Sequence, residues 1–385
     1  MRSRPPVYSG VPPRHLYVHV PFCARRCSYC DFAIAVRSRV PVDDYVRAVA
    51  EELALRHPDA PEWSLDSLYF GGGTPSKLGG TGVARLLDAV RQRVALAPAA
   101  EVTLEANPED VSPDAALAWA GAGVTRISLG AQSFDDRALA WMHRTHDAQA
   151  IGRAVDAARA AGIENLSLDL IFALPESVER HWTRDLASAL ALEPTHLSLY
   201  GLTVEPATPV ARWRDRGQLR EAPEERYERD FLTAHDTLAA RGFTHYEVSN
   251  FARPGRESRH NSAYWTGVPY AGVGPSAHAF DGDRRRWNLS PYAAWMARIA
   301  DRADPIDADE LLTADNRAVE AVYLGLRTAR GLQLMEGEAG RLQPWLESGW
   351  ATVDSAGVLR LTAVGWMRLD ALTEHLTNLR SRYYI

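Results

Sequence analysis

The sequence predicts an α/β fold, in which a partial (β/α)6-type barrel is followed by a small C-terminal winged-helix-like domain. Short β-rich runs alternate with helix-length stretches from residue 14 to about residue 250, which argues for a parallel sheet covered by helices. There are six or so such units, which suggests an open or partial barrel rather than a small doubly wound sheet. The alternation stops after residue 250. Function in such barrels collects at the carboxyl ends of the strands.

The repeating part contains seven β-rich runs and six helix-length stretches. The runs are HLYVHV (15–20), SLYF (67–70), VTLEA (102–106), RISLGAQS (126–133), LSLDLIF (166–172), HLSLYGL (196–202) and HYEVS (245–249). The helical stretches cover 42–56, 82–94, 114–122, 147–162, 179–192 and 224–242. In the first of these, Tyr45, Val49 and Leu53 recur every four residues, which is the spacing of one helix face.

The chain is predicted to divide into four parts. Residues 1–13 form a disordered leader, which is short and Pro-rich without the apolar segment of a secretion signal. Residues 14–250 form the barrel, and 251–309 form a loop-rich connecting region that contains HNSAYW. Residues 310–385 form the winged-helix-like domain. Its nine acidic and eight basic residues give no electrostatic support to a DNA-binding role.

Composition excludes several classes of function. The net charge of −6 gives no reason to expect a nucleic-acid partner. No apolar run approaches the roughly 18 residues that a membrane segment needs. All three cysteines lie within one eight-residue window, so they cannot form a disulfide framework. The lack of other cysteines fits a reducing compartment, which predicts a cytoplasmic protein.

The cysteines carry the most specific signal. Cys23, Cys27 and Cys30 follow a predicted strand with the spacing C-x3-C-x2-C, which lets three thiolates face one small object. A [4Fe-4S] cluster on three thiolates keeps one iron without a protein ligand, and that iron can chelate the amino and carboxylate groups of S-adenosylmethionine (SAM). A zinc site with a fourth ligand such as His19 is the alternative, and three incidental buried cysteines are another.

Glycines and polar residues follow the next strands. The segment FGGGTPS lacks the G-x4-G-K-[ST] pattern of a nucleoside triphosphate site, and a tight turn would also explain its glycines. Glu105, Gln132, Arg144 and Asp169 recur at or near successive strand ends, where surface or capping roles are the alternative. Asp169 lies inside an apolar run, so burial requires a partner, either a polar ligand such as SAM or a salt bridge with Arg144.

Together these motifs resemble the oxygen-independent coproporphyrinogen III oxidase-like family of radical SAM proteins, over about residues 14 to 380. The matching segments are YVHVPFCARRCSYCDF, FGGGTPS, LEANP, SLGAQSF, DLIFALP, HLSLYGLTVEP, YEVSNFARPG and HNSAYW. The resemblance implies a radical SAM barrel with Cys23, Cys27 and Cys30 as cluster ligands. The SAM contacts that it implies are Tyr17, Tyr29, Gly72, Gly73, Thr74, Glu105, Gln132, Arg144 and Asp169.

The family has two kinds of member. The oxidase has a further cysteine two residues after the third cluster cysteine, where this chain has Phe32. The heme-chaperone kind has an HNxxYW motif, matched here by His260, Asn261, Tyr264 and Trp265. The resemblance therefore favours a heme chaperone that binds the cluster, SAM and heme and delivers heme to heme-accepting proteins. Those recipients could include membrane-associated proteins, and an electron donor is a further expected partner. The oxidase, a radical SAM oxidative decarboxylase, remains the alternative.

His260 is the first candidate for an axial heme ligand, because imidazole suits iron, and Tyr264 and Trp265 could stack on the macrocycle. His278 is a second candidate. Alternatively, His260 and Trp265 pack the barrel against the C-terminal domain. The chain departs from the family pattern at ALPE, where Ala173 and Glu176 replace glycines, and at Ser258, where relatives often have cysteine.

Overall fold

A large, mostly parallel sheet organises the fold. The structure is a computed structural model that describes residues 12–57, 63–178 and 180–383, so most of the predicted leader lies outside the described residues. Nine strands pair in the order β11-β1-β4-β5-β6-β7-β8-β10-β9. The six strands from β1 to β8 in this order are parallel, which confirms the predicted partial barrel. They are β1 (His15–Val20), β4 (Ser64–Gly72), β5 (Ala95–Ala106), β6 (Arg126–Gln132), β7 (Asn165–Phe172) and β8 (His196–Gly201).

The two edges of this sheet are built differently. The parallel strand β11 (Ala271–Val273) extends the sheet beyond β1. At the other edge, β10 (Asn250–Ala252) pairs antiparallel with β8, and β9 (Thr244–Glu247) pairs antiparallel with β10. The run HYEVS is thus a strand but not a seventh parallel one, because only two residues separate β9 from β10 and a hairpin that short joins antiparallel strands.

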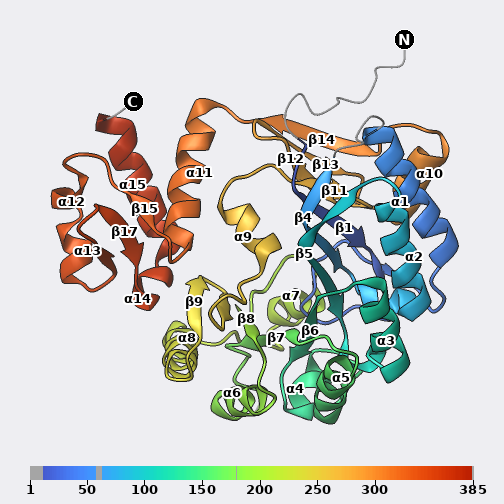
Figure 1. The fold of residues 1–385 in the computed structure, drawn as a ribbon. Helices are drawn as coiled ribbons and strands as arrows, with labels where there is room; N and C mark the ends of the chain where they lie inside the picture. Colours follow the sequence, from blue (N-terminus) through green and yellow to red (C-terminus); the bar gives the residue numbers. More distant parts are fainter. Residues whose placement is uncertain (1–11, 58–62, 179, 384–385) are drawn as a thin grey trace.

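Helices cover the outside of the curved sheet (Figure 1). They are α1 (Val42–Arg56), α2 (Gly79–Arg91), α3 (Pro113–Ala122), α5 (Ala148–Ala160), α6 (Trp182–Ala191) and α8 (Glu224–Ala239). Helix α1 begins and ends where the sequence predicts. The side chains of Ser112 and Asp147 cap α3 and α5 by accepting the amides of Ala115 and Ala150, which satisfies donors that helix geometry leaves free.

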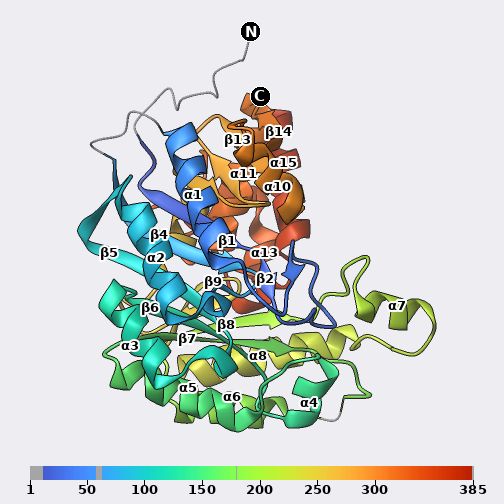
Figure 2. The same cartoon turned by 90° about the vertical axis from the view of Figure 1, so that its right-hand side faces the viewer.

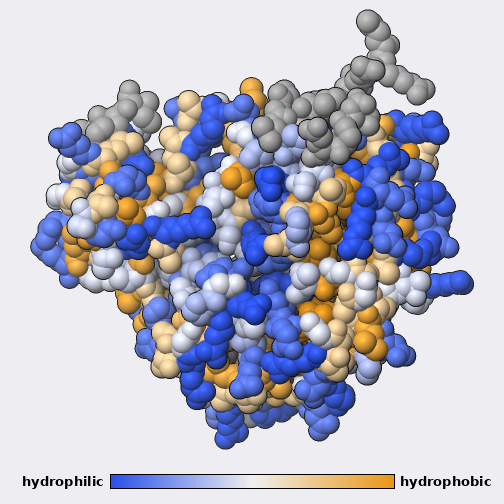
Figure 3. All heavy atoms as spheres, viewed as in Figure 1, coloured by the Kyte–Doolittle hydropathy of each residue, from blue (hydrophilic) through white to orange (hydrophobic). Residues whose placement is uncertain are grey.

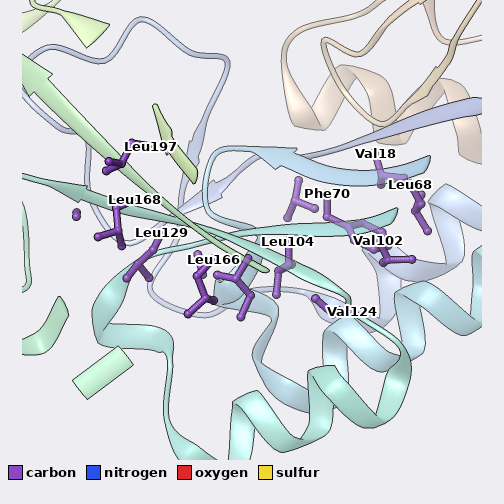
Figure 4. Packing of buried hydrophobic residues seen from close by; sticks show 14 of the residues in the cluster. Val18, Leu68, Phe70, Val102, Leu104, Val124, Leu129, Leu166, Leu168 and Leu197 are labelled. Carbon is purple, nitrogen blue, oxygen red and sulfur yellow. The ribbon is translucent and has the colours of Figure 1, made fainter. Parts of the chain in front are cut away.

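The strands carry apolar side chains on one face and polar side chains on the other. Residues such as Val18, Leu68, Phe70, Leu104 and Leu168 are buried in the main hydrophobic core (Figure 4). Their neighbours in the chain point to the opposite face, since strand side chains alternate. These neighbours are mostly polar and include Ser67, Thr103, Glu105, Ser128, Ser167 and Asp169. The outer face therefore packs against the helices, and the inner face forms a polar barrel interior.

Residues 251–309 contain more regular structure than the sequence predicts. Helix α9 (Arg259–Trp265) holds HNSAYW, and β12 (His278–Phe280), β13 (Arg284–Asn288) and β14 (Ile306–Leu311) form an antiparallel sheet. Helix α10 (Tyr292–Ala300) lies between β13 and β14 in the chain. These strands have three to six residues and are separated by glycine and proline, so their alternation is too short to stand out in the sequence.

One buried carboxylate joins this segment to the barrel. Glu52 of α1 is fully buried and accepts hydrogen bonds from Asn288 (2.6 Å), the Gly274 amide (2.8 Å) and Trp295 (2.9 Å). Arg56, one turn later, forms an ion pair with Glu52 at 3.0 Å and donates to the Gly272 carbonyl at 2.7 Å. The first helix therefore holds β11 in place against β1.

The C-terminal part is a small domain of helices around an antiparallel sheet, as predicted. Its sheet has the order β15-β17-β16, with β15 (Leu332–Gln333), β16 (Ala351–Val353) and β17 (Val358–Leu361). Its helices are α11 (Ala314–Arg327), α12 (Glu338–Arg341), α13 (Gln343–Glu347), α14 (Ala363–Trp366) and α15 (Leu369–Tyr383). A β-bridge between Glu247 and Thr328 connects it to the barrel edge. Within the described residues, none of the helices has the length and apolar character required to span a membrane.

Candidate functional site: a cysteine loop and two adjoining cavities

The three cysteines lie in a loop that leaves the carboxyl end of β1. Two short strands, β2 (Phe22–Cys23) and β3 (Ala35–Val36), pair in parallel and close this loop. The Ser28 amide donates to the Met142 carbonyl, and the Ser28 carbonyl accepts from the Val210 amide of α7 (Pro209–Asp215). Figure 2 shows α4 (Asp136–Trp141) and α7 on the side of the sheet where β7 and β8 end. Hydrogen bonds made by Ser28 therefore attach the loop both to the end of α4 and to the start of α7.

The cysteine loop covers a cavity of about 440 Å³, which we call the cluster cavity. It contains most of the residues that the sequence analysis associates with the cluster and SAM. These are Cys23, Tyr29, Cys27, Cys30, Gly72, Gly73, Thr74, Glu105, Gln132, Arg144 and Asp169. They come from the ends of β1, β4, β5, β6 and β7 and from the segment after α4. Parallel strands thus bring together residues more than 140 positions apart in the chain.

The three cysteines have the chemistry of cluster ligands. All three thiols are free, and burial raises the pKa of Cys23 and raises that of Cys30 to about 11. A bound cationic cluster would counter this by stabilising thiolates. In the part of the chain that the structure describes, no three His, Cys, Asp or Glu side chains are grouped closely enough for one metal ion. A cluster takes its thiolates at separate iron atoms, and the three cysteines line one cavity, so they fit a cluster.

The glycines after β4 allow close packing against the cysteine loop. Gly72 has a φ of 112°, and a Cβ there would lie 2.5 Å from the His19 ring. A Cβ on Gly73 would lie 2.6 Å from the Pro21 carbonyl oxygen. Both positions therefore exclude a side chain. Thr74, the next residue, places its hydroxyl 3.3 Å from the Cys23 sulfur, so this turn directly supports the first cysteine.

Two buried carboxylates line the cavity. Glu105 accepts hydrogen bonds from the Tyr69 hydroxyl at 2.8 Å and the Gly72 amide at 3.0 Å. Burial raises its pKa to about 7. Asp169 accepts from the hydroxyls of Ser128 (3.1 Å) and Ser167 (3.3 Å), and burial raises its pKa as well. Protonation of either group is therefore easier than for an exposed carboxylate, and a cationic ligand would favour the charged forms.

Arg144 contacts the cysteine loop and does not contact Asp169. Its guanidinium lies 3.5 Å from the Cys27 sulfur and donates to the Gly130 carbonyl at 2.9 Å. Burial lowers its pKa, but the negative charges that Tyr29, Cys27 and Glu109 carry when ionised outweigh burial and raise it overall. Among the described residues, Arg144 donates to the Cys27 sulfur, the Asn107 side chain and the Gly130 carbonyl, and not to Asp169. The salt bridge considered as an alternative role for Asp169 is therefore wrong, because Asp169 takes its hydrogen bonds from serines.

Two departures from the family pattern have a structural counterpart. Ala173 has a φ of 53°, in the left-handed region that favours glycine, so the glycine expected at this position would relieve backbone strain. Ser258 is the N-cap of α9 and accepts the Asn261 amide at 3.3 Å, a role that a hydroxyl performs well.

Sequence reasoning missed Arg126, which lies at the start of β6 and is 1% exposed. Its Nε and one terminal nitrogen are buried and have no hydrogen-bond partner among the described residues. Its charge lowers the pKa values of Glu105 and Asp169, although burial dominates both. Strand alternation in RISLGAQS could have indicated this residue, because it places Arg126 on the same strand face as Ser128 and Gly130.

A second and larger cavity adjoins the cluster cavity. It has a volume of about 1260 Å³, and we call it the α11 groove because α11 forms one wall. Tyr17, Tyr264, Trp265, Tyr270, Phe280 and Tyr323 provide an aromatic lining, and Arg285 and Arg317 add charge. Asp31, Phe32, Gly72 and Glu105 line both cavities. Figure 3 shows the surface of the molecule in the view of Figure 1, with hydrophilic and hydrophobic residues intermixed.

The structure places Tyr17 and His260 outside the cluster cavity. Tyr17 lines the α11 groove, and its hydroxyl lies 3.2 Å from His19 Nδ1. His260 is 1% exposed and lines neither cavity. Its Nδ1 lies 2.7 Å from the Ser67 hydroxyl and its Nε2 lies 2.8 Å from the Tyr264 hydroxyl. With both ring nitrogens hydrogen-bonded, His260 has the geometry of a packing residue, the alternative role considered above.

The last two residues of the motif, Tyr264 and Trp265, line the groove. The guanidinium of Arg327 stacks on the Trp265 ring at 4.2 Å. Arg327 also forms an ion pair with the buried carboxylate of Glu247 at 3.2 Å. The Trp265 Nε1 is buried without a hydrogen-bond partner among the described residues. The motif therefore joins the barrel interior, the groove and the C-terminal domain.

Comparison with known proteins identifies the family. The profile of the radical SAM superfamily matches residues 17–187. The chain is 38% identical to the protein named heme chaperone HemW from Synechocystis sp., over 83% of this chain and 79% of that protein. It is also 38% identical to the HemW of Mycobacterium tuberculosis, over 84% of this chain and 83% of that protein.

The fold matches a solved structure of another radical SAM protein. Coproporphyrinogen III oxidase (HemN) from Escherichia coli superposes with a TM-score of 0.81 and 22% identity, covering 95% of this chain and 91% of that chain. At this identity the match establishes the shared fold, whereas the sequence relatives establish the family. The chain therefore belongs to the HemW family within the radical SAM superfamily.

Proposed function

We propose that this chain is a heme chaperone, which binds heme in the α11 groove beside a [4Fe-4S] cluster and SAM and delivers the heme to heme-accepting proteins. The groove is the observation that carries this proposal. Its volume of about 1260 Å³ exceeds the range of about 300–1,000 Å³ that is typical of small-molecule sites. Its aromatic lining suits a flat macrocycle, and the two arginines suit carboxylate side groups.

The cluster cavity supports the other two ligands. Cys23, Cys27 and Cys30 would hold the cluster, and membership of the radical SAM superfamily implies both a cluster and SAM. When bound, the cluster would supply an electron to SAM, which requires an electron donor. Glu105 and Asp169 would meet the polar groups of SAM, and Arg126 would favour their charged forms. Because the three thiols must stay reduced, the cytoplasm is the compartment that we propose.

Heme titration of the purified protein tests the proposal. We expect ferric heme to bind with a shifted Soret band. Ala321 is exposed on α11 and lines the groove, so Ala321→Trp should obstruct the groove and weaken heme binding by about tenfold or more. Ala318→Trp places the same side chain at an exposed position of α11 outside the groove and is the matched control. Absent heme binding, or equal affinities in both variants, would contradict the proposal.

Delivery is tested separately. Heme-loaded protein is mixed with a heme-free cytochrome, and the spectrum of the recipient is followed over time. We expect heme to move to the recipient faster than it dissociates into a solution that contains only a heme scavenger. Equal rates would show passive release and would contradict the chaperone function while leaving heme binding intact.

Loss of either cavity carboxylate should weaken SAM binding without loss of the cluster. Hydrogen bonds to charged groups contribute about 1.5–3 kcal/mol, so Glu105→Ala and Asp169→Ala should each weaken SAM binding by about ten- to a hundredfold. Iron content should stay unchanged, since neither residue contacts a cysteine. Anaerobic calorimetry after iron analysis measures both quantities. Glu164→Ala, at an exposed position before the amino end of β7, is the control. Parental SAM affinity in both cavity variants would assign these carboxylates a structural role.

The shared wall of the two cavities keeps one alternative function open. Asp31, Phe32, Gly72 and Glu105 line both cavities, so a radical formed in the cluster cavity would lie across this shared wall from a ligand in the groove. This geometry favours oxidative decarboxylation of coproporphyrinogen III as a second candidate. Because Phe32 stands where the oxidase has a cysteine, we expect no conversion to protoporphyrinogen IX with SAM and reductant. Chromatography of the porphyrins decides the matter, and sustained turnover would restore the oxidase function.

A further inference from the structure

The α11 groove contains two histidines, His19 and His278. His19 lies on β1, and its Nε2 is 3.0 Å from the Ala33 carbonyl oxygen while its Nδ1 is 3.2 Å from the Tyr17 hydroxyl. Its side chain is therefore occupied in holding the cysteine loop. His260 is excluded by its position, since it lines neither cavity and both its ring nitrogens are hydrogen-bonded.

His278 differs from both. It is exposed at the start of β12, and no described residue hydrogen-bonds to its ring nitrogens. Its ring stacks on that of its cross-strand neighbour Trp287, with centroids 5.7 Å apart and planes inclined by 23°. Stacking of this kind limits rotation of the imidazole. The groove therefore contains one oriented imidazole whose ring nitrogens have no hydrogen-bond partner among the described residues, so its unprotonated nitrogen is available to a ligand.

The hairpin of β12 and β13 places complementary groups beside this imidazole. His278 and Phe280 lie on one face of β12, because alternate residues of a strand share a face. Arg285 pairs with Phe280 across the hairpin and lies on the same face, with its guanidinium 5.9 Å from the Phe280 ring. On the opposite face, Ala279 and Arg286 are buried. One face of the hairpin thus presents three groups to the groove, which are the imidazole of His278, the ring of Phe280 and the guanidinium of Arg285.

We propose that His278 is the protein ligand of the heme iron in the α11 groove, with Phe280 against the macrocycle and Arg285 beside a propionate. This inference depends on the heme function proposed above. Iron takes a neutral imidazole nitrogen, and the second nitrogen of such a ligand is usually hydrogen-bonded or solvated. Arg285 forms an ion pair with Glu320 at 2.7 Å, and its remaining donors are available to a carboxylate.

The test compares heme spectra of histidine variants by visible absorption and electron paramagnetic resonance. We expect His278→Ala to lose the nitrogen-ligated spectrum and to weaken heme binding by more than about tenfold, the loss seen even when an outer partner of a metal ligand is removed. Free imidazole should restore the spectrum by entering the vacated space. His278→Cys should give the different spectrum of a thiolate ligand. His181→Ala, at an exposed position before α6, is the matched control and should match the parent.

The outcomes separate this inference from the function on which it depends. If the parent protein binds no heme, the heme function fails. If the parent binds heme and His278→Ala keeps the same spectrum and affinity, the heme function stands and the assignment of His278 is overturned. His278 is exposed, so these variants should fold, and circular dichroism verifies this. A spectrum that changes in His260→Ala but not in His278→Ala would return the ligand to the HNSAYW motif.

Discussion

Replacing any one of the three cysteines by alanine should abolish the iron–sulfur cluster. We expect about four irons and four sulfides per parent chain after anaerobic reconstitution. Because a cubane on three thiolates has no protein ligand to spare, Cys23→Ala, Cys27→Ala and Cys30→Ala should each lose the brownish absorbance. Iron and sulfide analysis together with the visible spectrum measures this result.

The small number of cysteines in the chain simplifies the interpretation of this experiment. All three cysteines lie in the one loop, so the triple variant contains no thiol at all. Arg39→Ala changes an exposed residue just beyond β3 and should retain the parental iron content. Full iron content in the triple variant would show that the metal is bound elsewhere and would remove the basis for a cluster site in the loop.

Loss of Glu52 should have the largest effect on stability. Its carboxylate is buried without solvent exposure and accepts from Asn288, Trp295 and the Gly274 amide as well as from Arg56. Breaking a buried ion pair from one side costs about 3–5 kcal/mol, because the partner charge stays buried. We therefore expect Glu52→Ala to lower the free energy of unfolding by about that amount, as measured by urea denaturation.

A neighbouring residue provides the control for this prediction. Glu51→Ala removes a carboxylate from the exposed side of the same helix and should change stability by less than about 0.5 kcal/mol. Glu52→Gln should lie between the two, since it keeps one acceptor oxygen but not the charge. A Glu52→Ala variant as stable as Glu51→Ala would show that the contacts between α1 and β11 contribute little.

The sequence predicts the fold best where the local pattern is long. Helix α1 is recognisable from Tyr45, Val49 and Leu53, and the parallel strands follow from β-rich runs of four to eight residues. The three residues of β11 have no such pattern. Their place in the sheet depends on Glu52, which lies more than 200 residues earlier in the chain. A contact of that separation cannot be inferred from periodicity.

The same limit applies to the site. The position of a residue at a strand end can be inferred from its neighbours in the sequence. Glu105, Gln132 and Asp169 are expected at strand ends on this basis, and they line one cavity. The environment of a side chain is not local. His260 looks like a ligand in the sequence because of its chemistry, yet Ser67 and Tyr264 occupy both its nitrogens. His278 carries no stronger signal in the sequence, and only the hairpin pairing shows its orientation toward the groove.

Because side chains alternate between the two faces of each barrel strand, substitutions at neighbouring positions should have different effects. Leu68, Leu104 and Leu168 point outward into the helix layer, so changes there should alter thermal stability and expression with little effect on ligand affinity. Their neighbours Glu105 and Asp169 point inward and line the cluster cavity, so substitution there should alter ligand affinity at smaller cost to the core. In a deep mutational scan of this protein, sensitive positions should therefore alternate along each strand. Substitutions at outward-facing positions should lower protein abundance, and substitutions at the inward-facing positions between them should lower ligand binding.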